Sequence, residues 1–196
     1  MEAIKRLLAS RDILVTRHSA EHRSEWMTRV SRVKEERELL LSHGEACQII
    51  SAVQAARMIP GDMAELGVAY GASAKLILDY SAHKRLHLFD TFDGLPDPGL
   101  GDSAKFHAGD FKCDVDSVRK YLHTGASAEQ SERIVFHKGL FPDTTLPVIN
   151  HTFSFVHLDV DLYQSTLDGL RFFYPRMSAG GILISHDYGS ADDPAQ

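Results

Sequence analysis

The residues best placed to do chemistry are side chains that follow two apolar segments. Asp159 ends the apolar segment 152–159, and His186 and Asp187 follow the apolar segment 182–185. If these segments are neighbouring parallel strands, their carboxyl ends meet at the edge where open α/β sheets bind ligands. Such strands lie ~4.8 Å apart, so Asp159 and Asp187 can converge on one cation. Carboxylate oxygens suit Mg²⁺, and His186 would complete the site, although imidazole better suits a transition metal.

A glycine turn between an expected strand and an expected helix forms the second candidate site. Gly67 and Gly71 allow the chain to bend sharply and to lie close to a ligand. The free N–H groups at the start of the helix, near Ser73, point back towards this turn. Glu65 stands at the end of the strand, just before the first glycine. The spacing is Gly-x-x-x-Gly, which differs from the Gly-x-Gly-x-x-Gly of nicotinamide binders.

An acidic strand end repels a pyrophosphate but suits a cationic ligand that carries an amino acid, such as S-adenosylmethionine. Asp90 ends the expected strand 85–90 and follows Gly67 by 23 residues, near the ~20-residue offset at which an acid binds ribose hydroxyls. The alternative is a purely structural strand–turn–helix, because glycine turns are common in α/β domains. On the cofactor interpretation, these residues bind S-adenosylmethionine: Glu65, Gly67, Tyr70, Gly71, Ser73 and Asp90.

Strand-like and helical segments alternate along the chain, which predicts an α/β fold with a mainly parallel, doubly wound, Rossmann-like sheet. The capping box Ser42-x-x-Glu45 begins one helix, and Gly180-Gly181 is expected to end the last one. The expected strands are 63–66, 85–90, 133–139, 152–159 and 182–185.

We expect two regions, an N-terminal part over 1–59 and a cofactor-binding core over 60–196. Residues 1–41 are helical in pattern and highly charged, with one apolar stripe at Ile4, Leu7 and Leu8 and another at Trp26, Val30 and Val33. They form either an arm or lid or an ordinary pair of surface helices. The acceptor pocket is expected in variable segments, here 1–41 and 95–112.

Composition restricts the class of protein. The net charge is −6 and the isoelectric point is about 6.0, which gives no nucleic-acid footprint. No apolar run approaches the ~20 residues of a membrane helix. The two cysteines, Cys47 and Cys113, lie far apart and have no metal-type spacing, so a reduced, cytoplasmic pair is the default.

Several motifs together resemble the macrocin O-methyltransferase family. They occur in family order over residues 60–189, and the strings Asp-Thr-Phe-x-Gly-Leu-Pro and Asp-Leu-Tyr-x-Ser-Thr are specific. The resemblance implies a class I methyltransferase that uses S-adenosylmethionine and a divalent cation, usually Mg²⁺, to methylate hydroxyls on natural-product sugars. It also suggests a homodimer. The matching pieces begin at Pro60, Asp90, Lys138, His157 and Gly180.

The resemblance also assigns roles to individual residues. Asp159 matches the acid that binds metal and acts as base, and Asp187 matches a second metal acid. The family usually has two adjacent acids where this chain has His186-Asp187, which puts the identity of the cation in question. The family fold has seven strands, whereas this chain reaches Gln196 shortly after the fifth. We therefore expect the final hairpin to be lacking, through truncation or because something else covers the sheet edge.

Three functions follow from these patterns. The first is metal-assisted methyl transfer to a hydroxyl of a sugar or another small natural product. The second is a non-catalytic module that binds S-adenosylmethionine, motivated by the missing hairpin and by His186. The third is a metal-dependent hydroxylase on the same fold. Acids at strand ends can also simply bond loop amides or cap helices.

Overall fold

A computed structural model describes residues 20–186, with the side chains of 23–186. Its centre is a five-stranded sheet in the order β3-β2-β1-β4-β5, in which every neighbouring pair is parallel. This confirms the predicted parallel α/β sheet. Asp187 and the stripe at Ile4, Leu7 and Leu8 lie outside the described residues. The strands are β1 (Asp62–Leu66), β2 (Leu86–Asp90), β3 (Ile134–Lys138), β4 (Phe153–Leu158) and β5 (Met177–Ser185).

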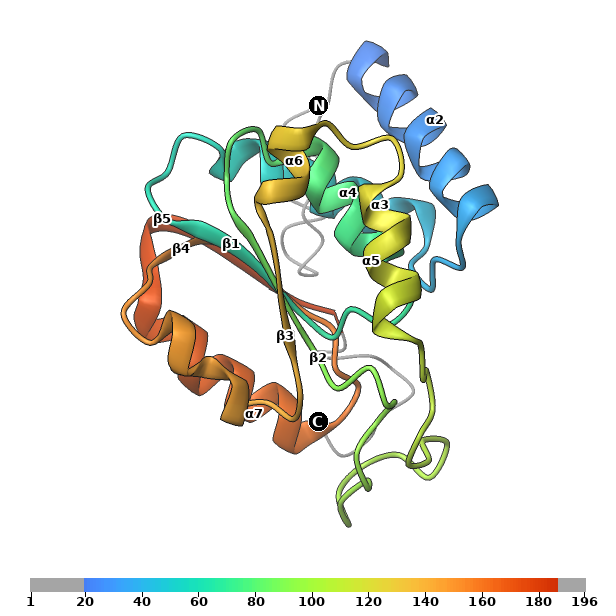
Figure 1. Ribbon diagram of the computed structural model, residues 1–196, viewed down its shortest axis with the longest axis vertical. Coiled ribbons are helices and arrows are strands. Elements are labelled where there is room, and N and C mark those ends of the chain that lie inside the picture. Colours follow the sequence, from blue (N-terminus) through green and yellow to red (C-terminus); the bar gives the residue numbers. More distant parts are fainter. Residues whose placement is uncertain (1–19, 187–196) are drawn as a thin grey trace, which may run out of the picture.

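Helices cover both faces of the sheet, as a doubly wound fold requires (Figure 1). One face carries α2, α3, α4 and α5, and the other carries α7. No helix in the described part of the chain is long and apolar enough to cross a membrane. The helices are α2 (Ala20–Glu36), α3 (His43–Ala56), α4 (Ala72–Tyr80), α5 (Val115–His123), α6 (Ala128–Glu132), α7 (Tyr163–Phe173) and the 3-10 turns η1 (Asp143–Val148) and η2 (Tyr174–Arg176).

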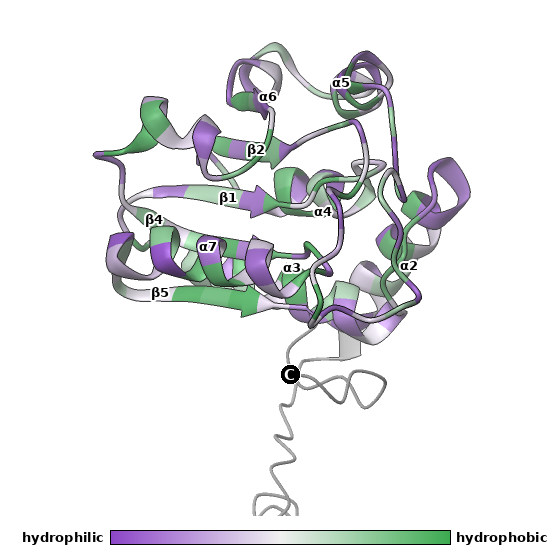
Figure 2. Cartoon of the chain, turned by 90° about the horizontal axis from the view of Figure 1, so that it is seen from below, coloured by the Kyte–Doolittle hydropathy of each residue, from purple (hydrophilic) through white to green (hydrophobic). Residues whose placement is uncertain are grey.

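The central strand β1 divides its side chains between the two layers. Met63 belongs to the hydrophobic cluster under α3 and α4, whereas Ala64 and Leu66 belong to the cluster under α7. This alternation follows from the period of two in a strand. Every residue of β4 is buried, as expected for a strand covered on both faces, and Figure 2 shows the edge strand β5 in hydrophobic colours along most of its length.

The helices that precede β1 pack on the core. Ser42 caps α3 and exchanges hydrogen bonds with Glu45, so the predicted capping box is confirmed. In α2, Trp26, Val30 and Val33 are buried in the same cluster as α3 and α4. The second predicted apolar stripe therefore faces the protein interior.

The prediction that Gly180 and Gly181 end a helix is wrong, because both lie inside β5. Phe153 of β4 pairs with Met177, but Phe155 pairs with Ile182, so β5 has extra residues at this point. Gly180 has a φ of +82°, a left-handed conformation that glycine adopts without strain. The glycine pair thus permits an irregularity in the strand where a helix end was expected.

A buried ion pair joins β1 to β4 beneath α4. The Nδ1 atom of His157 lies 2.9 Å from Oε1 of Glu65, and both side chains are fully buried. Burial raises the pKa of Glu65. Burial also opposes protonation of His157, but its hydrogen bond to Glu65 and the charge of that residue outweigh this effect and raise the pKa of His157. The pair therefore holds a proton inside the core.

We predict that His157→Leu lowers the free energy of unfolding by about 3–5 kcal/mol, because it leaves Glu65 buried without its partner. The double variant Glu65→Leu/His157→Leu should recover most of this loss, since two apolar side chains replace the whole pair. Urea unfolding monitored by circular dichroism measures both changes.

The matched control is His83→Leu. His83 lies at the same 2.9 Å distance from Glu129, but their side chains are 89% and 67% exposed. We expect a change within about 0.5 kcal/mol there. Equal losses for His83→Leu and His157→Leu would contradict the role given to the buried pair.

Candidate functional site

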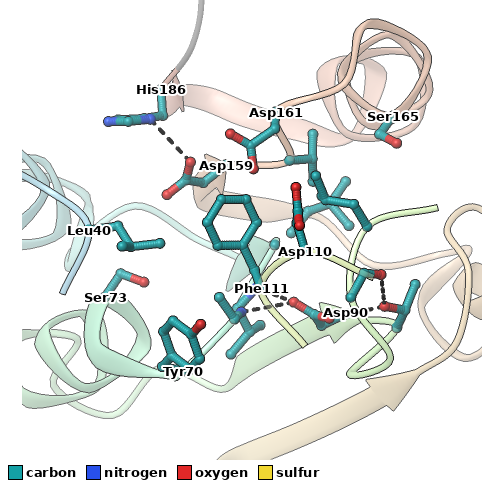
Figure 3. A pocket seen from close by; sticks show the side chains of 18 of the residues that line it. Leu40, Tyr70, Ser73, Asp90, Asp110, Phe111, Asp159, Asp161, Ser165 and His186 are labelled. Carbon is teal, nitrogen blue, oxygen red and sulfur yellow. Dashed lines mark hydrogen bonds and ion pairs between the residues drawn. The ribbon is translucent and has the colours of Figure 1, made fainter. Parts of the chain in front are cut away.

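A cavity of about 500 Å³ opens at the carboxyl ends of β1, β2 and β4. Its walls are the turn after β1, the segment after β2, the end of β4, the chain between α2 and α3, and the loop before α5. Figure 3 shows side chains from these elements pointing towards a common space. The position agrees with the rule that open α/β sheets bind ligands where the strand order reverses.

The turn after β1 lies directly against the end of β4. Gly67 has a φ of +88°, and a Cβ atom there would lie 1.7 Å from the carbonyl oxygen of Asp159. Backbone hydrogen bonds hold this arrangement, since Gly67 donates to Phe89 and Asp159 donates to Leu66, each at 2.9 Å. Only glycine fits at this position. The turn and the candidate catalytic residue therefore occupy fixed relative positions.

Asp90 organises the same turn from β2. Its Oδ2 accepts hydrogen bonds from the backbone N–H groups of Val68 and Ala69, at 2.7 and 2.9 Å. Its Oδ1 accepts one from the N–H of Phe92 at 2.7 Å. The carboxylate also lines the cavity. Asp90, which the sequence predicts to bind the cofactor, thus holds the glycine turn in place in this structure.

The opposite wall carries Asp159 and His186. The Nδ1 atom of His186 lies 3.1 Å from Oδ1 of Asp159, and its Nε2 lies 3.8 Å from a carboxylate oxygen of Glu45 in α3. The backbone N–H of His186 bonds Leu158 at 2.9 Å, so β4 and β5 fix the pair together. Figure 3 shows the two side chains at one end of the cavity, away from Asp90.

This pair fits part of a metal site. A carboxylate oxygen and an imidazole nitrogen 3.1 Å apart could share one ion. Among residues 20–186, no third side chain completes a metal-binding triad at this point. The predicted third ligand, Asp187, lies outside the described residues. The donors present fit two positions around a divalent cation.

The other predicted cofactor residues fall into two groups. Gly67, Tyr70 and Ser73 line the cavity, whereas Glu65 and Gly71 do not. Glu65 is fully buried behind the turn, with His157. Gly71 is the N-cap residue of α4 with a φ of +83°, and a Cβ there would meet Val118 at 2.7 Å. Glu65 and Gly71 therefore support the glycine turn from the side that faces away from the cavity.

Sequence reasoning missed several residues that line the cavity. Phe111 in the loop before α5 has a φ of +60°, and Figure 3 shows its ring between Asp159 and Asp90. Leu40 contributes from the segment between α2 and α3. Both lie within the segments 1–41 and 95–112, where an acceptor pocket was expected, but nothing in their local pattern distinguishes them.

The cavity is acidic. Its lining includes one lysine, Lys105, and these carboxylates: Glu38, Asp90, Asp110, Asp159 and Asp161. Such a lining attracts cations because the low-dielectric walls focus the field of the charges. It therefore favours a positively charged ligand over a phosphate-bearing one.

We predict that Gly67→Ala lowers the free energy of unfolding by more than about 3 kcal/mol, because the added Cβ meets backbone that cannot move aside. The control is Gly125→Ala, since Gly125 has a similar φ of +73° but an added Cβ would meet no other atom within 4 Å. It should lose only about 1 kcal/mol from backbone strain. Urea unfolding measures both changes. Equal losses of stability in Gly67→Ala and Gly125→Ala would show that contact with the Asp159 backbone does not restrict position 67.

Comparison with known proteins identifies the relatives of this chain. A 4'-O-methyltransferase from Streptomyces olivaceus, named for 8-demethyl-8-(2,3-dimethoxy-alpha-L-rhamnosyl)-tetracenomycin-C, is 31% identical over 142 residues, or 66% of this chain and 54% of the relative. The demethyldecarbamoylnovobiocin O-methyltransferase from Streptomyces niveus is 31% identical over 144 residues, or 66% of this chain and 53% of the relative. This chain spans about half the length of these relatives.

Solved structures show the same fold. The O-methyltransferase NovP has a TM-score of 0.72 at 22% identity, covering 91% of this chain and 87% of its own. The calicheamicin methyltransferase CalS11 has a TM-score of 0.67 at 18% identity, covering 92% and 83%. A family model described as macrocin-O-methyltransferase (TylF) matches residues 44–196. Because that match extends over most of the sequence, the chain belongs to the macrocin O-methyltransferase family.

Proposed function

We propose that this protein transfers the methyl group of S-adenosylmethionine to a hydroxyl of a sugar or related natural product. The observation that carries the proposal is one acidic cavity that is lined by the glycine turn after β1, here called the cradle, and by the Asp159–His186 pair. Membership of the family and the printed activities of the Streptomyces relatives support it.

The cradle is the cofactor end of the proposed site. Gly67 lets the backbone lie close to the ligand, and Tyr70 and Ser73 line the space beside it. Asp90 would exchange some of its contacts for the ribose hydroxyls, since a carboxylate has lone pairs for several donors. Glu65 would act from behind, by supporting the turn through its buried pair with His157. The surrounding carboxylates favour that cation.

Asp159 is the proposed base. The acceptor hydroxyl would give its proton to Asp159 while the oxygen lone pair attacks the methyl carbon. The bound cofactor would supply the methyl group, with the electron pair of the broken carbon–sulfur bond left on sulfur in S-adenosylhomocysteine. While no ion is bound, His186 would hold the carboxylate in position through Nδ1. Most of the acceleration would come from alignment of two bound reactants, which is where a preformed cavity contributes.

A divalent cation such as Mg²⁺ would be held by Asp159, His186 and Asp187 and would lower the pKa of the acceptor hydroxyl. Leu40 and Phe111 would cover the acceptor, so the chain between α2 and α3 and the loop before α5 would serve as its lid. The expected homodimer and cytoplasmic location belong to this proposal as well.

The direct test is methyl transfer from isotope-labelled S-adenosylmethionine to the two acceptors named for the relatives, with calorimetry of cofactor binding in parallel. We expect labelled product, and Asp159→Asn should lower kcat by at least about 100-fold with little change in cofactor affinity. Asp116→Asn is the control, since its side chain is 83% exposed on α5. Full turnover by Asp159→Asn would rule out its role as base.

Asp90→Ala should weaken cofactor binding more than it lowers kcat, which is the reverse of the effect expected for Asp159→Asn. Loss of the carboxylate frees the N–H groups of Val68 and Ala69, which loosens the cradle. We expect the cofactor dissociation constant to rise at least about tenfold, since more than one hydrogen bond is lost, with kcat at saturation changed less. Unchanged calorimetric affinity would show that Asp90 does not serve the cofactor.

Metal removal separates two parts of the proposal. Activity should fall after treatment with EDTA and return when Mg²⁺ or another divalent cation is added, because the ion acidifies the hydroxyl. Activity that survives chelation would reject the metal and leave Asp159 and His186 to act alone. Cofactor binding without any transfer would instead favour a non-catalytic binding module.

A further inference from the structure

A second group of potential metal ligands lies at the opposite end of the sheet from the cavity. Asp62 begins β1, His87 lies in β2, and His151 lies in the segment before β4. One ligand atom from each of the three lies within 4.8 Å of the others. The length of β1, ~3.3 Å per residue, separates this group from the glycine turn. It is therefore distinct from the candidate active site.

The geometry of the group is close to that of a metal site. Oδ2 of Asp62 lies 3.1 Å from Nε2 of His87 and 2.8 Å from Nδ1 of His151. Ligands at ~2.0–2.1 Å from a tetrahedral ion stand about 3.4 Å apart, so an ion would require the distance from Asp62 to His87 to grow by about 0.3 Å and that to His151 by about 0.6 Å. Two imidazoles and one carboxylate are a donor set typical of Zn²⁺ and related ions.

A fourth side chain fixes the central ligand. Nδ1 of His87 lies 3.0 Å from Nε2 of His137 in β3. Metal-binding histidines generally hold their second ring nitrogen in a hydrogen bond, which sets the tautomer and the ring orientation. If Nε2 of His87 bound a metal, its Nδ1–H would donate to His137. The His137 ring also stacks on Phe89 at 4.2 Å between centroids, so it is itself held in place.

The group is also accessible on one side. The His87 side chain is 3% exposed, whereas Asp62 and His151 are 28% and 32% exposed. An ion could therefore enter past Asp62 and His151 and reach a rigid, buried imidazole. A water molecule could occupy the remaining coordination position on that open side.

We propose that Asp62, His87 and His151 bind one divalent transition-metal ion of the Zn²⁺ class, with His137 as a positioning residue. The ion would link the amino ends of β1 and β2 to the segment before β4. The linked strands are neighbours in the sheet. The site's role is structural, because it lies away from the cavity and stabilises the folded state by binding it.

The test uses the whole 196-residue chain in which Asp159→Asn, His186→Asn and Asp187→Asn remove the proposed cavity donors. After chelation and dialysis, Zn²⁺ is titrated by calorimetry, and Co²⁺ is titrated while its visible ligand-field absorption is followed. We expect one ion per chain, a tetrahedral Co²⁺ spectrum and a higher Tm with Zn²⁺. No saturable binding in this background would overturn the proposal.

Further variants assign the ligands. His151→Gln and Asp62→Asn, at partly exposed positions, should each weaken binding at least about tenfold and abolish the Tm increase, and His137→Phe should weaken it about 10–100-fold. His83→Gln is the control, because this histidine is exposed beside Glu129. Circular dichroism verifies folding. Zn²⁺ binding that survives both His151→Gln and Asp62→Asn would show that the ion binds elsewhere.

Discussion

The arrangement of the candidate site depends on the contact between Gly67 and the backbone of Asp159. No side chain fits between them, so the turn that would hold the cofactor and the residue that would accept the proton are one rigid unit. Parallel pairing of β1 with β4 brings them together, since Leu66 pairs with Leu158 immediately before the contact. Alignment of two reactants then requires little further ordering of the protein.

The buried pair of Glu65 and His157 lies directly beneath this contact. Such pairs seldom add net stability, because removal of two charged groups from water offsets their attraction. A slip of one residue between β1 and β4 would separate these two side chains in a region without water. The pair therefore favours the register that places Gly67 against Asp159, and we interpret it as a determinant of register.

The positions of the strand ends could be predicted from the sequence, because the pattern of apolar residues marks each strand and a parallel sheet aligns their ends. Asp90 and Asp159 follow apolar segments, and a parallel sheet must bring such residues to one edge. By contrast, Asp62 meets His87 across 25 residues and His151 across 89. No local pattern records such contacts. The position of the Phe111 ring inside the cavity is likewise set by the path of an irregular loop. The place of Gly180 and Gly181 within β5 is set by an irregular pairing with β4.

The imidazole of His186 bears on the choice of ion at the cavity. Carboxylates alone suit Mg²⁺, which prefers oxygen ligands, whereas an imidazole shifts preference towards first-row transition metals. The group around Asp62 has the same preference, since two of its three donors are imidazoles. Metal content of the purified protein would thus report on both ends of the sheet together. Assignment of an ion to either end requires variants that remove the donors at the other, because affinity alone does not distinguish sites with similar ligands.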